Sequence, residues 1–377
     1  MKDKIQKVID VLDNNLIGLD KKVATIGFDG FIDAVVHVVK KKENIDNLKY
    51  FNKIEEFGNY LISKKGVSGC IELDEKLTKM GGNMPIMSNA MGNLGIKVNC
   101  VGAFGLPAIK EEFKCMEKSN CTIYSVAEPG NTLALEFNDG KIMLARMPAL
   151  DRLTWKDIAK IVGIERLIEL YSESDLIGVV NWSEVENSSL IWEGILRDII
   201  PFCKPHKEQI MFFDLSDCSK KIPGDIKKVL NIIKEFAPYY KVILGMNENE
   251  ARLIYNCIAE SKVNLNLDEM GDIIYDTLSI DEIVIHPISY SMAWNKDGRH
   301  RIDNLFIDKP EFSTGGGDNF NAGFCSARLL GLDLESSMII GNALSGFYIK
   351  NGFSAKVPEL IRFLHEWKLT ISENTLR

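Results

Sequence analysis

Residues 312–324 read F-S-T-G-G-G-D-N-F-N-A-G-F, and apolar residues recur at helical spacing after the three glycines. This pattern places Gly315, Gly316 and Gly317 at the start of a helix. Backbone without side chains can approach a ligand closely, and the free N–H groups and the dipole of a helix start attract anions. The sequence therefore predicts an anion-binding loop at this point.

Asp318 follows the glycines directly, and two interpretations of its carboxylate are open. A carboxylate in the first turn of a helix is favoured by the helix dipole, so the first interpretation makes Asp318 structural. However, a carboxylate repels a phosphate that is merely bound beside it. On the second interpretation Asp318 is a general base, which takes a proton from an attacking hydroxyl group while the glycine amides hold a migrating phosphoryl group.

The chain upstream of this motif alternates between helical patterns and short apolar strands from about residue 154 onward. The predicted strands cover residues 176–180, 210–213, 242–244 and 283–285. Strands that alternate with helices imply right-handed crossovers and a largely parallel sheet covered on both faces. We therefore expect an α/β fold with three layers, α/β/α, around a mostly parallel sheet.

The first part of the chain does not show this alternation of strands and helices. Residues 34–39 are β-branched and predict an extended run, and the lysine- and asparagine-rich residues 40–50 predict a solvated loop. Residues 132–144 predict a hairpin, because Asn138-Asp139-Gly140 has the composition of a tight turn. We expect a small β-lid, formed by inserted segments of about 34–50 and 124–147, on a single domain that spans residues 1–377.

Two further motifs lie between these regions. Gly81-Gly82 opens a run of small residues that predicts a helix ending at Leu94-Gly95. The sequence N-E-N-E, residues 247–250, comes directly after a predicted strand. Such a run is typical of a capped helix start, but it is also placed where ligands bind in α/β sheets.

These motifs together resemble the ribokinase-like, or PfkB, carbohydrate kinase family. The glycine-rich run is similar to the second family signature, D-T-x-G-A-G-D, with Phe312, Ser313 and Gly316 in place of the first Asp, the Thr and the Ala. The run from Gly81 resembles the first signature, residues 247–250 the N-x-x-E motif, and the hairpin the lid. The likeness extends from about residue 25 to about residue 358.

The resemblance implies a kinase that uses ATP and Mg²⁺. Asp318 would then be the catalytic base, and the amides of Gly315, Gly316 and Gly317 the anion hole. Glu250 would hold Mg²⁺ through water, because Mg²⁺ keeps much of its hydration shell. The residues implied for the nucleotide and its metal are Asn247, Glu250, Thr314 and Asn342, the last on the helix that borders the adenine.

The resemblance also implies a sugar site. Asp33 matches the sugar-binding aspartate of the family, and Asp29 competes for this role because the stretch from Gly27 to Asp33 carries an extra residue relative to the usual family spacing. The other residues implied for this pocket are Gly81, Gly82 and Asn83. The family usually has an asparagine where this chain has Ile86, so either Asn83 does that work or the substrate lacks that contact. The identity of the sugar is therefore open.

Weaker signals are also open to two interpretations. Lys141 and Arg146 on the hairpin would meet an anionic substrate or simply be solvated. Asp214 and Asp217 follow an apolar strand and would touch phosphates or Mg²⁺, or form a turn. The five histidines form no spaced cluster and are interpreted as structural or surface residues.

The composition restricts the partners. The formal net charge of −8 argues against a nucleic-acid-binding protein, which needs a basic face. The eight cysteines show no C-x-x-C pair, the N-terminus has no apolar leader, and no segment is apolar enough to span a bilayer. We expect a cytoplasmic enzyme with no membrane partner. The family resemblance leaves a homodimer through the lid and a requirement for a monovalent cation as open possibilities.

Three rival functions remain at this stage. A nucleoside kinase of the same fold would share the motifs, and a non-catalytic sensor of sugars or nucleotides would share the scaffold. The intact Gly-Gly-Gly-Asp run argues against the sensor. A dinucleotide oxidoreductase is poorly supported, because the chain contains neither G-x-G-x-x-G nor the Walker motif G-x-x-x-x-G-K-[ST].

Overall fold

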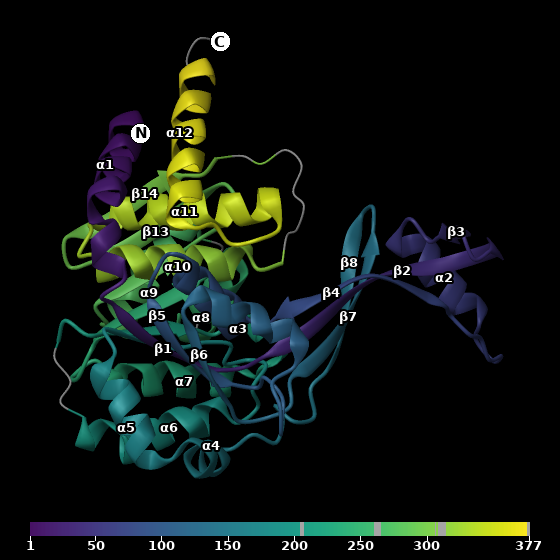
Figure 1. Cartoon of the computed structure of the whole chain (residues 1–377), viewed down its shortest axis with the longest axis horizontal. Coiled ribbons are helices and arrows are strands. Elements are labelled where there is room, and N and C mark those ends of the chain that lie inside the picture. The colour runs from purple at the N-terminus through teal and green to yellow at the C-terminus, as the bar shows by residue number, and fades with distance from the viewer. Residues whose placement is uncertain (204–206, 260–264, 306, 308–313, 375–377) are drawn as a thin grey trace.

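A computed structural model describes residues 1–203, 207–259, 265–305, 307 and 314–374, with the backbone alone for 15–17 and 372–374. Within these residues, nine strands form a central sheet that lies between two layers of helices, and a smaller sheet projects from one side (Figure 1). The strands of the central sheet, in spatial order, are β14 (Gly298–Asp303), β13 (Tyr290–Asn295), β12 (Glu282–Ile285), β11 (Lys241–Met246), β10 (Ile210–Asp214), β9 (Leu176–Val179), β1 (Val23–Phe28), β5 (Lys97–Gly102) and β6 (Cys121–Ser125).

The sheet is parallel from β12 to β6. Strand β13 pairs antiparallel with β12, and the edge strand β14 pairs antiparallel with β13. The four strands predicted from the alternating pattern are β9, β10, β11 and β12, side by side in chain order. The predicted three-layer α/β/α architecture with a mostly parallel sheet is confirmed.

Two groups of helices cover the two faces of the sheet. One face carries α1 (Lys2–Leu19), α3 (Asn83–Asn93), η1 (Glu111–Ser119), α10 (Gly316–Leu329), α11 (Leu334–Asn351) and α12 (Val357–Asn374). The other carries α4 (Trp155–Val162), α5 (Ile164–Glu173), α6 (Ser188–Asp198), η2 (Ile200–Phe202), η3 (Cys218–Lys220), α7 (Pro223–Phe236), α8 (Glu248–Ile258) and α9 (Leu267–Leu278). None of the described helices is both long and apolar enough to cross a membrane.

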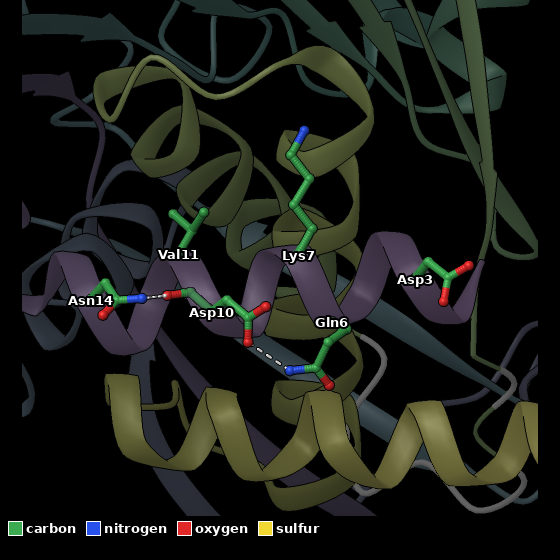
Figure 2. Close-up of a pocket in the computed structure, with 6 residues that line it drawn as sticks. All are labelled: Asp3, Gln6, Lys7, Asp10, Val11 and Asn14. Atoms are coloured by element: carbon green, nitrogen blue, oxygen red, sulfur yellow. Dashed lines mark hydrogen bonds between the residues drawn. The ribbon is translucent and has the colours of Figure 1, made fainter.

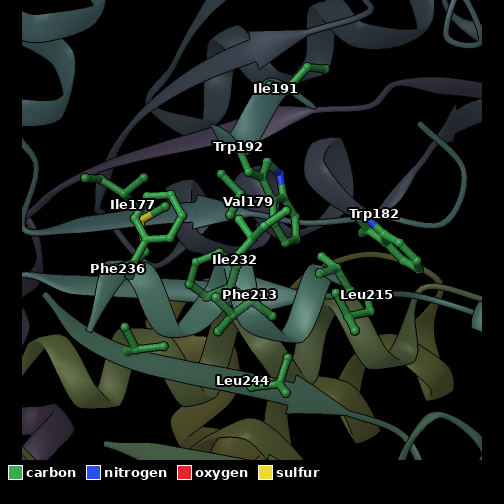
Figure 3. Close-up of a cluster of buried hydrophobic side chains, with 14 of the residues drawn as sticks. Ile177, Val179, Trp182, Ile191, Trp192, Phe213, Leu215, Ile232, Phe236 and Leu244 are labelled. Carbon is green, nitrogen blue, oxygen red and sulfur yellow. The ribbon is translucent and has the colours of Figure 1, made fainter. Parts of the chain in front are cut away.

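The second layer of helices is held to the sheet by a cluster of large aromatic side chains (Figure 3). The ring of Trp192 on α6 lies 5.1 Å from that of Phe213 on β10, which in turn lies 5.4 Å from that of Phe236 on α7. All three side chains are fully buried. Burial of such large apolar areas stabilises the scaffold, and it fixes the ends of β9, β10 and β11 relative to one another.

The smaller sheet contains the predicted lid hairpin. Its strands are β3 (Asn47–Tyr50), β2 (Phe31–Asn44), β7 (Gly130–Phe137) and β8 (Gly140–Arg146), with β4 (Leu73–Gly81) paired to β2 and α2 (Ile54–Ser63) packed against one face. The segments 34–50 and 124–147 both contribute strands to it. Strand β4 and helix α2 were not foreseen as parts of the lid.

The prediction of a solvated loop over residues 40–50 is wrong. Strand β2 continues to Asn44, and β3 pairs back against it in antiparallel register. The many lysines did not prevent a strand here, because their charges are paired across it: Lys42 with Glu72 at 2.7 Å, and Lys49 with Glu43 at 2.8 Å. Charged side chains are common on exposed edge strands, where they oppose edge-to-edge aggregation.

Candidate active site

Polar residues gather at the carboxyl ends of the parallel strands. These residues are Asp29 after β1, Asn181 after β9, Asp214 at the end of β10, Asn247 after β11 and His286 after β12. Since parallel strands all end at the same edge of a sheet, these side chains come together although they are far apart in the sequence. Helix α10, which starts with the glycine run, begins at this same edge. The candidate site forms where these residues and the start of α10 meet.

The glycine run forms the start of α10. Gly315 is its N-cap residue, with a φ of 96°, in the left-handed region that favours glycine. A Cβ on Gly315 would lie 2.8 Å from Tyr348 Oη, and one on Gly316 would lie 3.0 Å from Ile349 Cδ1. The positive φ and the close approach of Tyr348 favour glycine at Gly315, whereas at Gly316 a Cβ would only have to displace the flexible end of Ile349. The N–H groups of the first turn of a helix have no partner within it and are free for a ligand.

Asp318 lies in the first turn of α10 and remains partly exposed. Its side chain makes no hydrogen bond within the described residues and does not cap α10, while its place in the first turn is one that the helix dipole favours. Burial raises the pKa of Asp318 well above its ordinary range, and the carboxylates of Asp214, Asp29, Glu250 and Asp33 raise it further. A carboxyl group with a raised pKa is a stronger base once it is ionised.

Asp33 lies on β2, in a row of residues that crosses the lid sheet from Lys79 to Thr132. Burial raises the pKa of the Asp33 carboxyl, while a hydrogen bond from Thr132 and the charges of Lys79 and Lys141 oppose the rise. A Cβ on Gly81 would lie 2.7 Å from Asp33 Oδ1, so the glycine makes room for this carboxylate. Of the four carboxylates whose charges raise the pKa of Asp318, Asp33 contributes least.

Asp29 has a different environment. It is fully buried, and its carboxylate accepts hydrogen bonds from the backbone N of Asn83 (2.9 Å), the backbone N of Met84 (2.8 Å) and Asn181 Nδ2 (2.6 Å). Burial raises its pKa to about 6. Gly82 allows this approach, because a Cβ there would lie 2.7 Å from Asp29 Oδ2. Asp29 thus holds the start of α3, and Asp33 stays the prediction for sugar binding.

Asn247 and Glu250 form a reciprocal cap at the start of α8. Asn247 Oδ1 accepts from the Glu250 backbone N at 2.9 Å, and Glu250 Oε2 accepts from the Asn247 backbone N at 2.8 Å. The capped helix start that the N-E-N-E run suggested is therefore present. Burial raises the pKa of Glu250 well above its ordinary range, and the nearby charge of Asp214 raises it further.

Asp214 is a second buried carboxylate at this point. Asn321 Nδ2 donates to it at 2.6 Å and the Ser216 backbone N at 2.7 Å, and burial raises its pKa to about 6. In the part of the chain that the structure describes, no three His, Cys, Asp or Glu residues are placed to hold a metal directly. Two neighbouring buried carboxylates nevertheless favour a cation, so Asp214 and Glu250 fit a hydrated Mg²⁺ better than a directly ligated one.

A cavity of about 370 Å³ adjoins the glycine run. Asn342 of α11 lines it together with Gly316 and Gly317, whereas Thr314 is exposed and is not one of the lining residues. Asn342 Nδ2 donates to Ser291 Oγ at 3.0 Å. The cavity is lined by His286, Pro287, Ile288, Asn304, Leu305, Ile307, Gly316, Gly317, Phe320, Asn342, Ser345, Gly346 and Ile349. Phe312 and Ser313 lie outside the described residues.

His286 is a lining residue that the sequence did not single out. Its ring packs on Phe320 with centroids 4.6 Å apart, and burial lowers its pKa to about 4, so it is neutral at physiological pH. Its position after a strand was the only signal that placed it here. Of the two hairpin cations, Lys141 pairs with Glu136 at 3.4 Å and acts on Asp33, whereas Arg146 is exposed.

Another hollow, of about 440 Å³, lies on the outer surface of α1 (Figure 2). Its lining residues are Asp3, Gln6, Lys7, Asp10, Val11 and Asn14. Lys7 pairs with Asp333 at 2.8 Å, and Gln6 donates to Asp10 at 2.7 Å. None of the predicted site residues belongs to this hollow, so the cavity beside the glycine run is the candidate ligand site.

Comparison with known proteins gives a family match over nearly the whole chain. A family model described as prokaryotic ketohexokinase matches residues 7–367. A ketohexokinase from Haloferax volcanii is 26% identical over 345 residues, which cover 89% of this chain and 89% of that protein.

Solved structures show the same fold at low sequence identity. A protein described as ribokinase II from E. coli, solved in complex with ATP and Mg²⁺, has a TM-score of 0.65 and 12% identity, and the match covers 92% of this chain and 99% of that one. The adenosine kinase from Sinorhizobium meliloti has a TM-score of 0.64 and 15% identity, with coverage of 90% and 98%. The ribokinase-like family and fold predicted from the motifs are confirmed.

Proposed function

Because the chain belongs to the prokaryotic ketohexokinase family, a family of sugar kinases with the ribokinase fold, we propose that it phosphorylates a ketohexose with ATP and Mg²⁺. That the chain is a carbohydrate kinase follows from the family itself. The proposal concerns the sugar, the cofactors and the residues. One observation carries it: Asp318 follows the glycine start of α10, where Gly316 and Gly317 line a cavity together with Asn342.

The proposed reaction uses the side chains in distinct roles. Asp33 accepts hydrogen bonds from sugar hydroxyl groups, a role that suits a carboxylate. Asp318 takes the proton of the attacking hydroxyl as that oxygen forms a bond to the γ-phosphorus. The bond from the γ-phosphorus to the bridging oxygen breaks, and ADP leaves with the electron pair. The amides of Gly315, Gly316 and Gly317 hold the migrating phosphoryl group, where negative charge develops.

The nucleotide would occupy the cavity between α10 and α11. Asn342 contributes polar contacts there. His286 also lines the cavity, but it is neutral and cannot balance the negative charge of the phosphates, so another group must do so. Bound Mg²⁺ would supply neutralisation of phosphate charge. Asp214 and Glu250 are the residues that would hold it through water, because both are buried and the charge of Asp214 raises the pKa of Glu250.

The acceptor distinguishes this proposal from its rivals. We expect an ADP-release assay, run with ketohexoses, aldohexoses, pentoses, keto-acid sugars and nucleosides, to give the highest kcat/KM with a ketohexose. Parallel assays in sodium and potassium buffers measure any need for a monovalent cation. A nucleoside as the best acceptor would support a nucleoside kinase, the activity named for the relative from Sinorhizobium meliloti. No turnover with any acceptor would support a sensor.

The lid sheet supports a further proposal, a homodimer formed through it. Leu77, Val35, Ala134 and Met143 are paired in one row across four strands, on the same face as Asp33. The two ends of this row, Leu77 and Met143, are 41% and 43% exposed. Val35 and Ala134 between them are 4% and 2% exposed, so the exposed apolar surface of the row is its two ends. Such exposed ends suit a protein partner, and the lid of a second copy would cover them.

A charge placed in the row tests the dimer. We expect the wild-type protein to sediment as a dimer and Met143→Glu to sediment as a monomer, because the carboxylate would be buried unpaired at the interface. Leu190→Glu is the matched control, since Leu190 is an exposed leucine on α6, outside the lid. It should leave the dimer intact. A monomeric wild-type protein, or equal dissociation of both variants, would contradict the proposal.

A further inference from the structure

Helix α11 presents neighbouring residues to two different parts of the site. Ser345 and Ile349 line the nucleotide cavity, whereas Tyr348 packs against Gly315. Successive residues of a helix are turned by about 100° from one another, so Tyr348 points away from the cavity that Ile349 lines. A Cβ on Gly315 would lie 2.8 Å from Tyr348 Oη and 3.0 Å from Cε1. Tyr348 therefore places its hydroxyl group beside the first residue of the anion-binding loop.

The hydroxyl group of Tyr348 is available to a ligand. The residue is only 6% exposed, and its hydroxyl forms no hydrogen bond within the residues that the structure describes. Its oxygen is not among the buried polar atoms that lack a partner, so it remains accessible from outside the packed ring. Burial raises the pKa of Tyr348 to about 12, and the charges of Asp318 and Asp33 contribute, so the group is protonated at neutral pH. An available O–H donor thus lies beside Gly315, within reach of the charges of both carboxylates.

A sugar bound next to these two carboxylates needs a hydrogen-bond donor as well as acceptors. Ionised Asp33 and Asp318 can only accept hydrogen bonds, whereas every sugar hydroxyl both donates and accepts. A hydroxyl that gives its proton to one of these carboxylates keeps lone pairs that need a donor. Burying those lone pairs without a partner would cost binding free energy. Tyr348 supplies the complementary donor.

We propose that Tyr348 is a substrate-binding residue whose hydroxyl group donates a hydrogen bond to an oxygen of the bound ketose between Asp33 and Asp318. The inference rests on the proposed function, in which these two carboxylates face the sugar. It adds a residue from α11, the helix that also lines the nucleotide cavity, to the acceptor side of the site.

Tyr348→Phe tests the inference, because it removes the oxygen and keeps the ring that packs on Gly315. We expect kcat/KM for the ketohexose to fall about 10- to 100-fold, because the variant leaves an oxygen of the bound sugar without its hydrogen-bond donor. ATP affinity and the melting temperature should stay unchanged. Tyr240→Phe is the matched control: Tyr240 is also buried, its hydroxyl has no partner among the described residues, and it immediately precedes β11, at the opposite edge of the sheet. It should keep full activity.

Substrate analogues identify the contact. In a series of ketohexose analogues, each lacking one oxygen, the gap between wild type and Tyr348→Phe should vanish for the analogue without the contacted oxygen and persist for the others. Wild-type kcat/KM in Tyr348→Phe, an equal loss in Tyr240→Phe, or the same gap with every analogue would overturn the inference. The proposed function is tested separately. If Tyr348→Phe is fully active and Asp318→Asn is inactive, the role of Tyr348 is refuted and the proposed kinase function is not.

Discussion

Asp318→Asn is expected to lower kcat by about 10³-fold or more, because the amide cannot take a proton from the attacking hydroxyl group. The substitution keeps the shape of the side chain and removes one of the negative charges that crowd this edge of the sheet. ATP affinity, measured by calorimetry, should therefore stay the same or improve. Turnover is measured as ADP release at saturating ketohexose and ATP. Activity close to that of the wild type would refute the assignment of the base.

The pH dependence of the wild-type enzyme provides the control for this prediction. Burial and four neighbouring carboxylates raise the pKa of Asp318 in the free protein, and a general base works only when it is ionised. As the pH falls through that raised pKa, kcat/KM should therefore fall, beginning well above the range of an ordinary carboxyl group. The residual activity of Asp318→Asn should lack this acid limb. A flat wild-type profile across the weakly acidic range would contradict the environment described for Asp318.

Asp33→Asn and Asp29→Asn form a matched pair with opposite expected effects. Asp33→Asn should lower kcat/KM for the ketohexose by about 10²- to 10⁴-fold, because an amide replaces a carboxylate that accepts sugar hydroxyl groups. Its ATP affinity and melting temperature should change little. Asp29→Asn should instead destabilise the fold by about 1–3 kcal/mol, because an amide cannot accept all three hydrogen bonds that the Asp29 carboxylate receives.

Melting curves and sugar kinetics of both variants decide between the two aspartates. The opposite outcome, a stable Asp29→Asn protein that has lost its sugar affinity and an active Asp33→Asn protein, would assign the sugar to Asp29. The assignment matters for the pocket, because Gly81 makes room for Asp33 and Gly82 for Asp29. Each glycine of the pair thus serves a different carboxylate.

Several features of the fold were predictable because they depend on local patterns. The alternation of strands and helices predicted β9 to β12 and the parallel sheet, and the composition of the turn at Asn138 predicted the hairpin of β7 and β8. The strand at residues 40–50 was missed, since its lysines resemble a loop until their partners are known. Glu72, for example, lies 30 residues from Lys42, and no local pattern connects the two.

The chemistry of the site was less predictable than its motifs. Sequence motifs pointed to Asp318, the glycines, Asn247 and Glu250, and the structure places all of them at one edge of the sheet. Tyr348 and His286 had no such signal. Tyr348 reaches Gly315 only because α11 packs closely on α10, and Asn321 binds Asp214 across 107 residues of sequence.

The sequence by itself determined the layered α/β fold and the presence of a glycine-lined helix start followed by an acid. Both depend on the preferences of neighbouring residues, namely the periodicity of apolar side chains and the freedom of glycine backbone. Only the tertiary structure decided which aspartate holds α3 and which one stands on the lid sheet, and which side chain of α11 meets the loop. Those outcomes depend on strand register and helix packing, which bring together residues that share no local pattern.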